Sequence, residues 1–181
     1  MRQIYIFILI SLFYQLMMVQ QTNAAFIQLV ENEKKAASRS SLDVNVNPNT
    51  LNYDLQYVRL ELDLDPTQQY VSGTVTSHFK MLANSGNIYF DLANNLTVSQ
   101  VKYHNQNLAF QQLSTDEVLI NFPSTLTAQT TDSLSITYNG VPDGSSDAFV
   151  ADYTSANDPV LATLSEPFGA KEWWPTKQSM N

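Results

Sequence analysis

The stretch Val58-Arg59-Leu60-Glu61-Leu62-Asp63-Leu64-Asp65 alternates apolar and charged side chains until Pro66 ends it. Successive side chains of a β-strand point to opposite faces, so this period of two predicts a strand with one buried face. After a polar turn the alternation resumes. The residues expected to face inward are Val71, Gly73, Val75, Phe79 and Met81, and those expected outward are Ser72, Thr74, Thr76, His78 and Lys80. The two runs predict an antiparallel hairpin.

Short strands continue along the chain at regular spacing. They are expected at residues 88–92, 96–103, 108–112, 118–122, 134–138 and 160–164. Turn-forming residues separate them, as in Asn84-Ser85-Gly86-Asn87 and between Pro123 and Asp132. No stretch of useful length has helical periodicity. The pattern predicts an all-β, antiparallel domain, either a β-sandwich or an open barrel.

The first 24 residues have the pattern of a secretory signal peptide. Arg2 precedes an almost wholly apolar run over residues 4–19, and Ala24 provides a small residue for cleavage. The alternative is an uncleaved membrane anchor, for which the run is short. We therefore expect export, a secreted extracellular product and no membrane span after cleavage. Residues 25–50 are expected to form a linker, and residues 51–165 the β domain.

Composition excludes several classes of function. The 181 residues contain 9 Lys+Arg against 17 Asp+Glu, a net charge of −8. Nucleic acid is therefore not an expected partner, because phosphate binding needs clustered basic residues. The chain has no cysteine, which excludes disulfides, thiolate metal sites and a cysteine nucleophile.

The chain carries no complete catalytic set. Its two histidines, His78 and His104, are far apart in sequence and have no adjacent glutamate, unlike the zinc motif His-Glu-x-x-His. Both are expected to be ordinary strand or turn residues. No Gly-x-Ser-x-Gly elbow is present. We therefore expect no catalytic residue, metal ligand or cofactor on this chain. Asn95-Leu96-Thr97 is a formal N-glycosylation triplet.

Both tryptophans lie together near the C-terminal end, in Lys171-Glu172-Trp173-Trp174-Pro175. Adjacent aromatic residues after the last strand suit two arrangements. They can close the end of the sandwich as a hydrophobic plug, or they can form an uncovered apolar patch that a second domain covers. We expect the second arrangement for Trp173 and Trp174.

Two segments carry a resemblance to a known family. Tyr53-Asp54, the run Tyr57 to Leu62 and the run Tyr70 to Val75 resemble the opening of the N-terminal domain of M1-family zinc aminopeptidases, the aminopeptidase N and leukotriene-A4-hydrolase group. Residues 164–175, Leu-Ser-Glu-Pro-Phe-Gly-Ala-Lys-Glu-Trp-Trp-Pro, resemble the family's Gln-x-Glu-Pro-x-x-Ala-Arg segment, and especially its Ser-Glu-Pro-Tyr-Gly-Ala-Lys-x-Trp-Trp-Pro-Cys form in secreted bacterial members. The resemblance covers residue 52 to the end.

The resemblance implies a saddle-like β-sandwich that precedes a thermolysin-like catalytic domain. That second domain would hold the zinc, on its His-Glu-x-x-His motif, and a Gly-x-Met-Glu-Asn loop; neither motif is present here. Residues 166–181 would begin the junction, and the missing domain would pack near Trp173 and Trp174. Two positions depart from the family pattern: Thr176 replaces a cysteine, and Leu164 replaces a substrate-contacting glutamine.

Glu166 is the residue for which the resemblance implies a substrate role. It matches the glutamate of the N-terminal domain that holds the free α-amine of a peptide at the edge of the active site. The alternative is an exposed loop glutamate that pairs locally with Lys171.

The sequence is compatible with two functions. The first is a non-catalytic N-terminal domain of a secreted zinc metallo-aminopeptidase that helps bind peptide N-termini. The second is a free-standing secreted β-sandwich for binding or adhesion, with Trp173 and Trp174 as its ligand platform.

Overall fold

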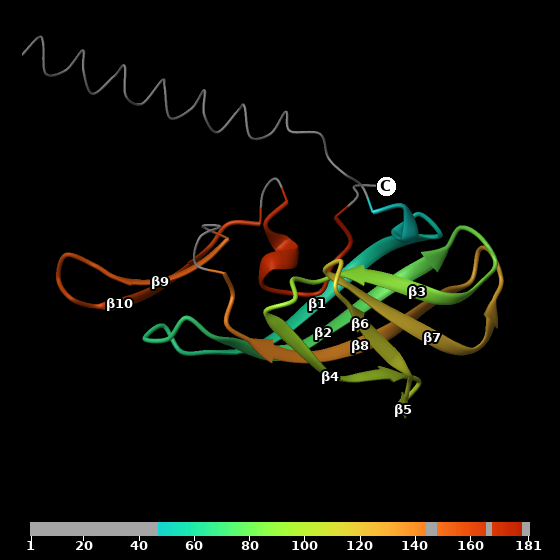
Figure 1. The fold of residues 1–181 in the computed structure, drawn as a ribbon, viewed down its shortest axis with the longest axis horizontal. Coiled ribbons are helices and arrows are strands. Elements are labelled where there is room, and N and C mark those ends of the chain that lie inside the picture. Colours follow the sequence, from blue (N-terminus) through green and yellow to red (C-terminus); the bar gives the residue numbers. More distant parts are fainter. Residues whose placement is uncertain (1–46, 144–147, 166–167, 179–181) are drawn as a thin grey trace, which may run out of the picture. The chain divides into compact units, whose positions relative to one another are not determined.

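The structure is a computed structural model that describes residues 47–143, 148–165 and 168–178. Glu166 and the predicted signal peptide lie outside these residues. The described residues form three antiparallel sheets, and their helical structure is limited to two 3-10 turns, Pro48–Thr50 and Ala170–Glu172 (Figure 1). The predicted all-β antiparallel fold is confirmed.

The largest sheet has five strands, and a three-stranded sheet packs against it. The strands of the first are, in spatial order, β1 (Tyr53–Leu64), β2 (Val71–Met81), β8 (Thr131–Gly140), β4 (Leu96–Tyr103) and β5 (Gln106–Asn107). Those of the second are β3 (Ser85–Asp91), β7 (Glu117–Leu126) and β6 (Phe110–Leu113). A separate two-stranded ribbon joins β9 (Phe149–Tyr153) to β10 (Pro159–Thr163).

Aromatic rings join the inner faces of the two larger sheets. Phe122 of β7 lies 6.0 Å from Phe79 of β2 and 5.3 Å from Tyr103 of β4, measured between ring centroids. Tyr53 of β1 lies 5.7 Å from Phe90 of β3. Such offset and edge-on pairs add to the stabilisation from apolar burial. The core is therefore that of a β-sandwich.

The predicted antiparallel hairpin is formed by β1 and β2, with Leu62 opposite Gly73 and Leu60 opposite Val75. All the residues of β2 predicted to face inward are buried except Gly73, which is half-buried. In β1 the prediction of a buried face is only partly correct, because Leu60 and Leu64 are 37% and 40% exposed. As the edge strand of its sheet, β1 has a neighbouring strand on one side only.

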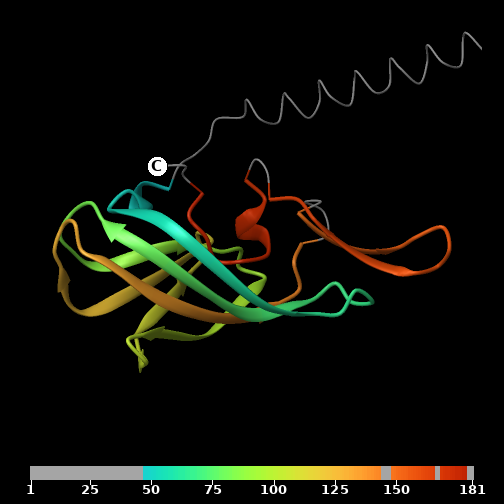
Figure 2. The same ribbon diagram turned by 180° about the vertical axis from the view of Figure 1, so that it is seen from behind.

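The turn between β1 and β2 contacts the ribbon β9–β10 (Figures 1 and 2). The side-chain amide of Gln69 donates from Nε2 to the carbonyl oxygen of Phe149, at 2.5 Å. Its Oε1 accepts from the backbone N–H of Ala151, at 2.8 Å. One glutamine therefore holds the two hairpins side by side.

The strands differ from the sequence-based expectation in some places. Strands β5 and β9 were not predicted. Strand β7 continues through Pro123 to Leu126. Pro123 has no N–H to donate, but it lies where the register between β3 and β7 shifts and the ladder of hydrogen bonds is interrupted. Pro48–Thr50, at the end of the stretch expected as a linker, forms a 3-10 turn with Asn47 as its N-cap, and Thr50 is fully buried.

Within the described residues, no helix has the length and apolar character needed to cross a membrane.

Gly73 allows the close approach of β1 to β2, which leads to a prediction about stability. A Cβ atom at position 73 would lie 2.4 Å from the carbonyl oxygen of Glu61 and 2.8 Å from a methyl carbon of Leu62. We expect Gly73→Ala to lower the free energy of unfolding by roughly 1–3 kcal/mol, because the strands must move apart. Urea denaturation measures this difference.

Gly86→Ala is the matched control. A Cβ atom there would have its nearest neighbour, Oγ1 of Thr125, at 3.9 Å, and we expect a change within about 0.5–1 kcal/mol. Equal stability of Gly73→Ala and the unsubstituted chain would contradict the close-approach argument.

Candidate functional site

The C-terminal segment, residues 168–178, is built into the sandwich. Thr176 forms an antiparallel bridge with Asp91 at the end of β3, with its N–H 3.0 Å from the Asp91 oxygen and its own oxygen 2.8 Å from the Asp91 nitrogen. The N–H of Ala93 donates to the carbonyl oxygen of Lys171, at 2.9 Å. Thr176, which stands where the resemblance expects cysteine, is 3% exposed. Its position is structural.

Trp173 is a core residue of this domain. It is 7% exposed, and its ring centroid lies 5.9 Å from that of Phe149 and 6.2 Å from that of Trp174. The buried hydroxyl of Tyr138 donates to its carbonyl oxygen, at 2.8 Å. The expectation that both tryptophans form an uncovered patch is therefore wrong for Trp173, which closes the end of the sandwich. Trp174 is half-buried.

Glu166, the predicted substrate-binding residue, lies outside the described residues, but the residues on either side of it are anchored. Leu164 donates its N–H to the carbonyl oxygen of Ala148 at 3.0 Å, and Gly169 donates to that of Ser165 at 2.9 Å. The indole N–H of Trp173 donates to Oγ of Ser165, at 3.3 Å.

Two positions of the sequence motif around Glu166, Gly169 and Leu164, have distinct environments. A Cβ atom at position 169 would lie 2.4 Å from the carbonyl oxygen of Leu164, so the backbone passes too closely for any residue but glycine. The side chain of Leu164 is 56% exposed. An apolar side chain thus stands in solvent where the resemblance expects a substrate-contacting glutamine.

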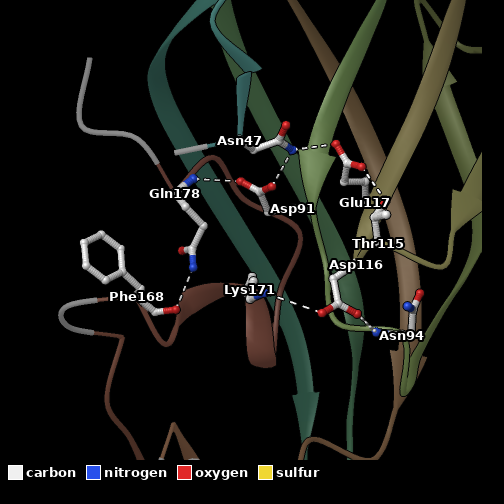
Figure 3. A network of polar contacts seen from close by, with 9 residues as sticks. All are labelled: Asn47, Asp91, Asn94, Thr115, Asp116, Glu117, Phe168, Lys171 and Gln178. Atoms are coloured by element: carbon white, nitrogen blue, oxygen red, sulfur yellow. Dashed lines mark hydrogen bonds and ion pairs between the residues drawn. The ribbon is translucent and has the colours of Figure 1, made fainter. Parts of the chain in front are cut away.

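The carboxylates of Asp91 and Glu117 clamp Asn47 to the same end of the domain (Figure 3). Nδ2 of Asn47 donates to Oδ1 of Asp91 at 2.8 Å and to Oε1 of Glu117 at 2.7 Å. The backbone N–H of Gln178 donates to Oδ2 of Asp91, at 3.0 Å. Asp91 therefore connects Asn47 with the C-terminal segment.

The carboxyl groups of Asp91 and Glu117 have pKa values shifted in opposite directions. Burial raises the pKa of Asp91 above its ordinary value, although the hydrogen bonds from Asn47 and Gln178 act against it. Burial would also raise the pKa of Glu117, but hydrogen bonds from Thr115, Asn49 and Asn47 outweigh it, so that pKa lies below its ordinary value. Glu117 is therefore the member of the pair whose charged form the fold favours.

Lys177 attaches the C-terminal segment to Tyr53 at the start of β1. It is 7% exposed, its Nζ donates to the carbonyl oxygen of Tyr53 at 2.5 Å, and it lies 4.9 Å from the centroid of the Tyr53 ring. Burial lowers the pKa of Lys177. A buried cation over an aromatic face joins the C-terminal segment to the start of β1.

An open, acidic hollow of about 570 Å³ adjoins the segment. Its carboxylates are those of Asp116, Asp143 and Glu172. Burial raises the pKa of Glu172, and the charges of Asp116 and Asp143 raise it further while Lys171 lowers it. Nζ of Lys171 lies 3.5 Å from Oδ2 of Asp116. Lys171, the alternative local partner of Glu166, therefore already has a carboxylate partner.

The two histidines have the ordinary positions expected from the sequence. His78 is exposed on β2 and packs edge-on against Tyr57, with ring centroids 5.3 Å apart. His104 follows β4, stacks on Tyr103 and lies 2.8 Å from Oδ1 of Asp132. In the described ranges, no three His, Cys, Asp or Glu side chains are grouped so that they could hold a metal ion. These residues do not fit a zinc site.

A family model for the peptidase M1 N-terminal domain matches residues 49–177. The chain belongs to this family. The match includes the hairpin β1–β2, the residues on both sides of Glu166 and almost all of the C-terminal segment. A search of curated proteins finds no match.

Solved structures of M1 enzymes have the same fold. An M1 zinc metallopeptidase from Deinococcus radiodurans is 25% identical over 70% of this chain, with a TM-score of 0.59. A two-domain M1 zinc metallopeptidase bound to L-arginine is 23% identical over 70% of this chain, with a TM-score of 0.57. Native yeast LTA4 hydrolase is 19% identical over 79% of this chain, with a TM-score of 0.59.

This M1 N-terminal domain corresponds to only part of each of these enzymes. It covers 29% of the D. radiodurans chain, 29% of the two-domain enzyme and 24% of the yeast hydrolase.

The clamp at Asn47 leads to a prediction about pH dependence. Glu117→Gln replaces an acceptor of several hydrogen bonds by an amide, and we expect a loss of about 1–3 kcal/mol in the free energy of unfolding at pH 7. The folded-state pKa of Glu117 lies below its ordinary value of 4.5, so the charge of Glu117 stabilises the fold fully above pH 4.5. This stabilisation is lost as the pH falls through the lower folded-state pKa. The difference in free energy of unfolding between the unsubstituted chain and Glu117→Gln therefore becomes smaller in acid.

Urea denaturation of both proteins over a series of pH values measures this narrowing. Glu61→Gln is the control: Glu61 pairs with Arg59 on the exposed face of β1, and we expect less than about 1 kcal/mol at any pH. A difference for Glu117→Gln that does not change with pH would contradict the assigned role of the charge.

Proposed function

We propose that this chain is the N-terminal domain of a secreted zinc metallo-aminopeptidase, in which Glu166 holds the α-ammonium group of the substrate. The observation that carries the proposal is the M1 N-terminal domain match over residues 49–177, which spans the sequence Ser165-Glu166-Pro167-Phe168-Gly169. Export is part of the proposal and rests on the sequence of residues 1–24.

A carboxylate suits the task given to Glu166. An exopeptidase must fix the free amino end of its substrate so that the first peptide bond meets the reacting centre, and small misplacements are costly. Charge-assisted hydrogen bonds between a carboxylate and an ammonium group contribute on the order of 1.5–3 kcal/mol each. Pro167 follows Glu166 in the sequence, and the proline ring restricts the backbone conformations available next to Glu166.

The neighbours of Glu166 support a positioning role. Gly169 donates its N–H to the carbonyl oxygen of Ser165, and the Trp173 indole N–H donates to the Ser165 hydroxyl. Binding groups are most effective when the surrounding structure fixes them before the ligand arrives. In this protein Ser165, the residue before Glu166, is joined to the core of the sandwich through Trp173.

The zinc of the proposed enzyme would be held by a catalytic domain and not by this chain. The described residues contain no group of three ligands, and the whole sequence has two histidines and no cysteine. Zinc in such an enzyme would polarise the scissile carbonyl and activate water, whereas this chain would supply the binding of the amino terminus.

The alternative function, a free-standing adhesion module, required a platform made by both tryptophans. The burial of Trp173, at 7% exposure, removes half of that platform. We therefore favour the aminopeptidase domain.

The proposal predicts that the chain alone is inactive. Purified residues 25–181, incubated with zinc and dialysed, should retain no stoichiometric metal and should not hydrolyse aminoacyl-anilides, because the ligand set is missing. Metal analysis and absorbance at the anilide band measure the two properties. Hydrolysis that a chelator abolishes would overturn the assignment of the chemistry to another domain.

A second prediction concerns Glu166 in the enzyme that joins this chain to its catalytic domain. Glu166→Ala should lower kcat/KM for aminoacyl substrates by roughly tenfold or more, because the ammonium group loses its carboxylate partner. Glu166→Gln, which keeps the shape and removes the charge, should lose nearly as much.

Glu61→Ala, on the exposed face of β1, is the control and should keep the unsubstituted kinetics. Zinc content should be equal in all of these proteins. Unchanged kcat/KM in Glu166→Ala would end the proposed role.

A further inference from the structure

The only Asn-x-Ser/Thr triplet of the whole sequence is Asn95-Leu96-Thr97, and it lies where the chain enters β4. Asn95 and Thr97 are exposed, whereas Leu96 between them is fully buried. This alternation follows from the strand, in which neighbouring side chains point to opposite faces. The acceptor amide and the hydroxyl two residues later are therefore both directed to solvent.

The backbone around the triplet is firmly held, so exposure of Asn95 does not depend on a loose loop. Leu96 lies opposite Gly140 of β8, and its carbonyl oxygen accepts from Nε2 of Gln112, at 2.5 Å. Its N–H donates to the carbonyl oxygen of Ala93, at 3.0 Å.

The side chain of Asn95 can carry a substituent in its present position. Its Nδ2 donates to the carbonyl oxygen of Val141, and a primary amide has two N–H groups. One N–H suffices for this bond, which leaves the other for substitution. Asn95 and Val141 both line the open hollow, and Val141 is 55% exposed. A glycan attached here would extend into solvent without displacing any core residue.

We propose that Asn95 is an N-glycosylation site of the exported protein, an inference that rests on the export included in the proposed function. The amide nitrogen of Asn95 forms a bond to C1 of the first N-acetylhexosamine of an oligosaccharide carried on a polyprenyl diphosphate. The bond between C1 and the diphosphate oxygen breaks, the diphosphate leaves with the electron pair, and the nitrogen loses one proton. Thr97 supplies the hydroxyl that defines the acceptor triplet.

A glycan at Asn95 would also restrict how a second domain packs. Asn95 and Asn94 line the hollow together with Glu172 of the C-terminal segment. A carbohydrate at this position keeps the rim of the hollow in solvent, so a catalytic domain would contact the sandwich elsewhere.

The test is expression of the full chain in a eukaryotic secretion host, followed by mass spectrometry of the secreted protein and of its peptides. Two versions are made, one with residues 1–24 and one in which an established secretion signal replaces them. The expected result is a mass increase on the peptide that contains Asn95. Treatment with a peptide-N-glycosidase should remove it and leave aspartate at position 95.

Four variants make the result specific. Asn95→Gln and Thr97→Ala should lose the modification, and Thr97→Ser should keep it because the hydroxyl remains. Asn94→Gln, which changes the adjacent exposed asparagine, is the matched control and should stay modified. The thermal midpoint of each variant, taken after deglycosylation, checks that folding is preserved.

The outcomes separate this inference from the proposed function. Secreted protein with an unmodified Asn95 in both versions would overturn the glycosylation site and leave the aminopeptidase assignment intact. Modification only with the replaced signal would support the site and remove export by residues 1–24 from the proposed function.

Discussion

Asp91, at the end of β3, is the residue on which the arrangement of both ends of the domain depends. Its backbone pairs with Thr176, and its carboxylate accepts from Asn47 and from the N–H of Gln178. The turn at Asn47 and the C-terminal segment therefore have a common attachment point on the three-stranded sheet. Burying this carboxylate is costly, as the raised pKa of Asp91 indicates, and the hydrogen bonds offset part of that cost.

The fold could be predicted from sequence wherever one face of a strand is buried by the other sheet. In β2 this holds along the whole strand, so the alternation from Val71 to Met81 matches the structure. In β1 the same alternation overstates burial, because Leu60 and Leu64 lie on an edge strand. Strand β9 was missed because only Phe149 of its five residues is buried, so its sequence lacks the alternation of a strand packed on the core.

The site was less predictable, for two physical reasons. The contacts of Asn47 with Asp91 and Glu117 join residues 44 and 70 positions apart, and no local pattern encodes such pairs. The tryptophan pair was ambiguous because a core plug and a domain interface require the same apolar side chains; only the packing of Trp173 on Phe149 separates them. Glu166 came from the family motif, and the anchoring of Ser165 and Gly169 became visible only in three dimensions.

The contact between Gln69 and β9 has a consequence for solubility. Exposed N–H and C=O groups along a strand edge are the groups through which strands of different molecules add to one another. Gln69 occupies two such groups, the carbonyl of Phe149 and the N–H of Ala151, with an amide that imitates a peptide bond. The turn of one hairpin thereby shields the edge of the other from intermolecular strand addition. A single polar side chain thus performs the protective task that other proteins give to a bulge, a proline or a covering helix.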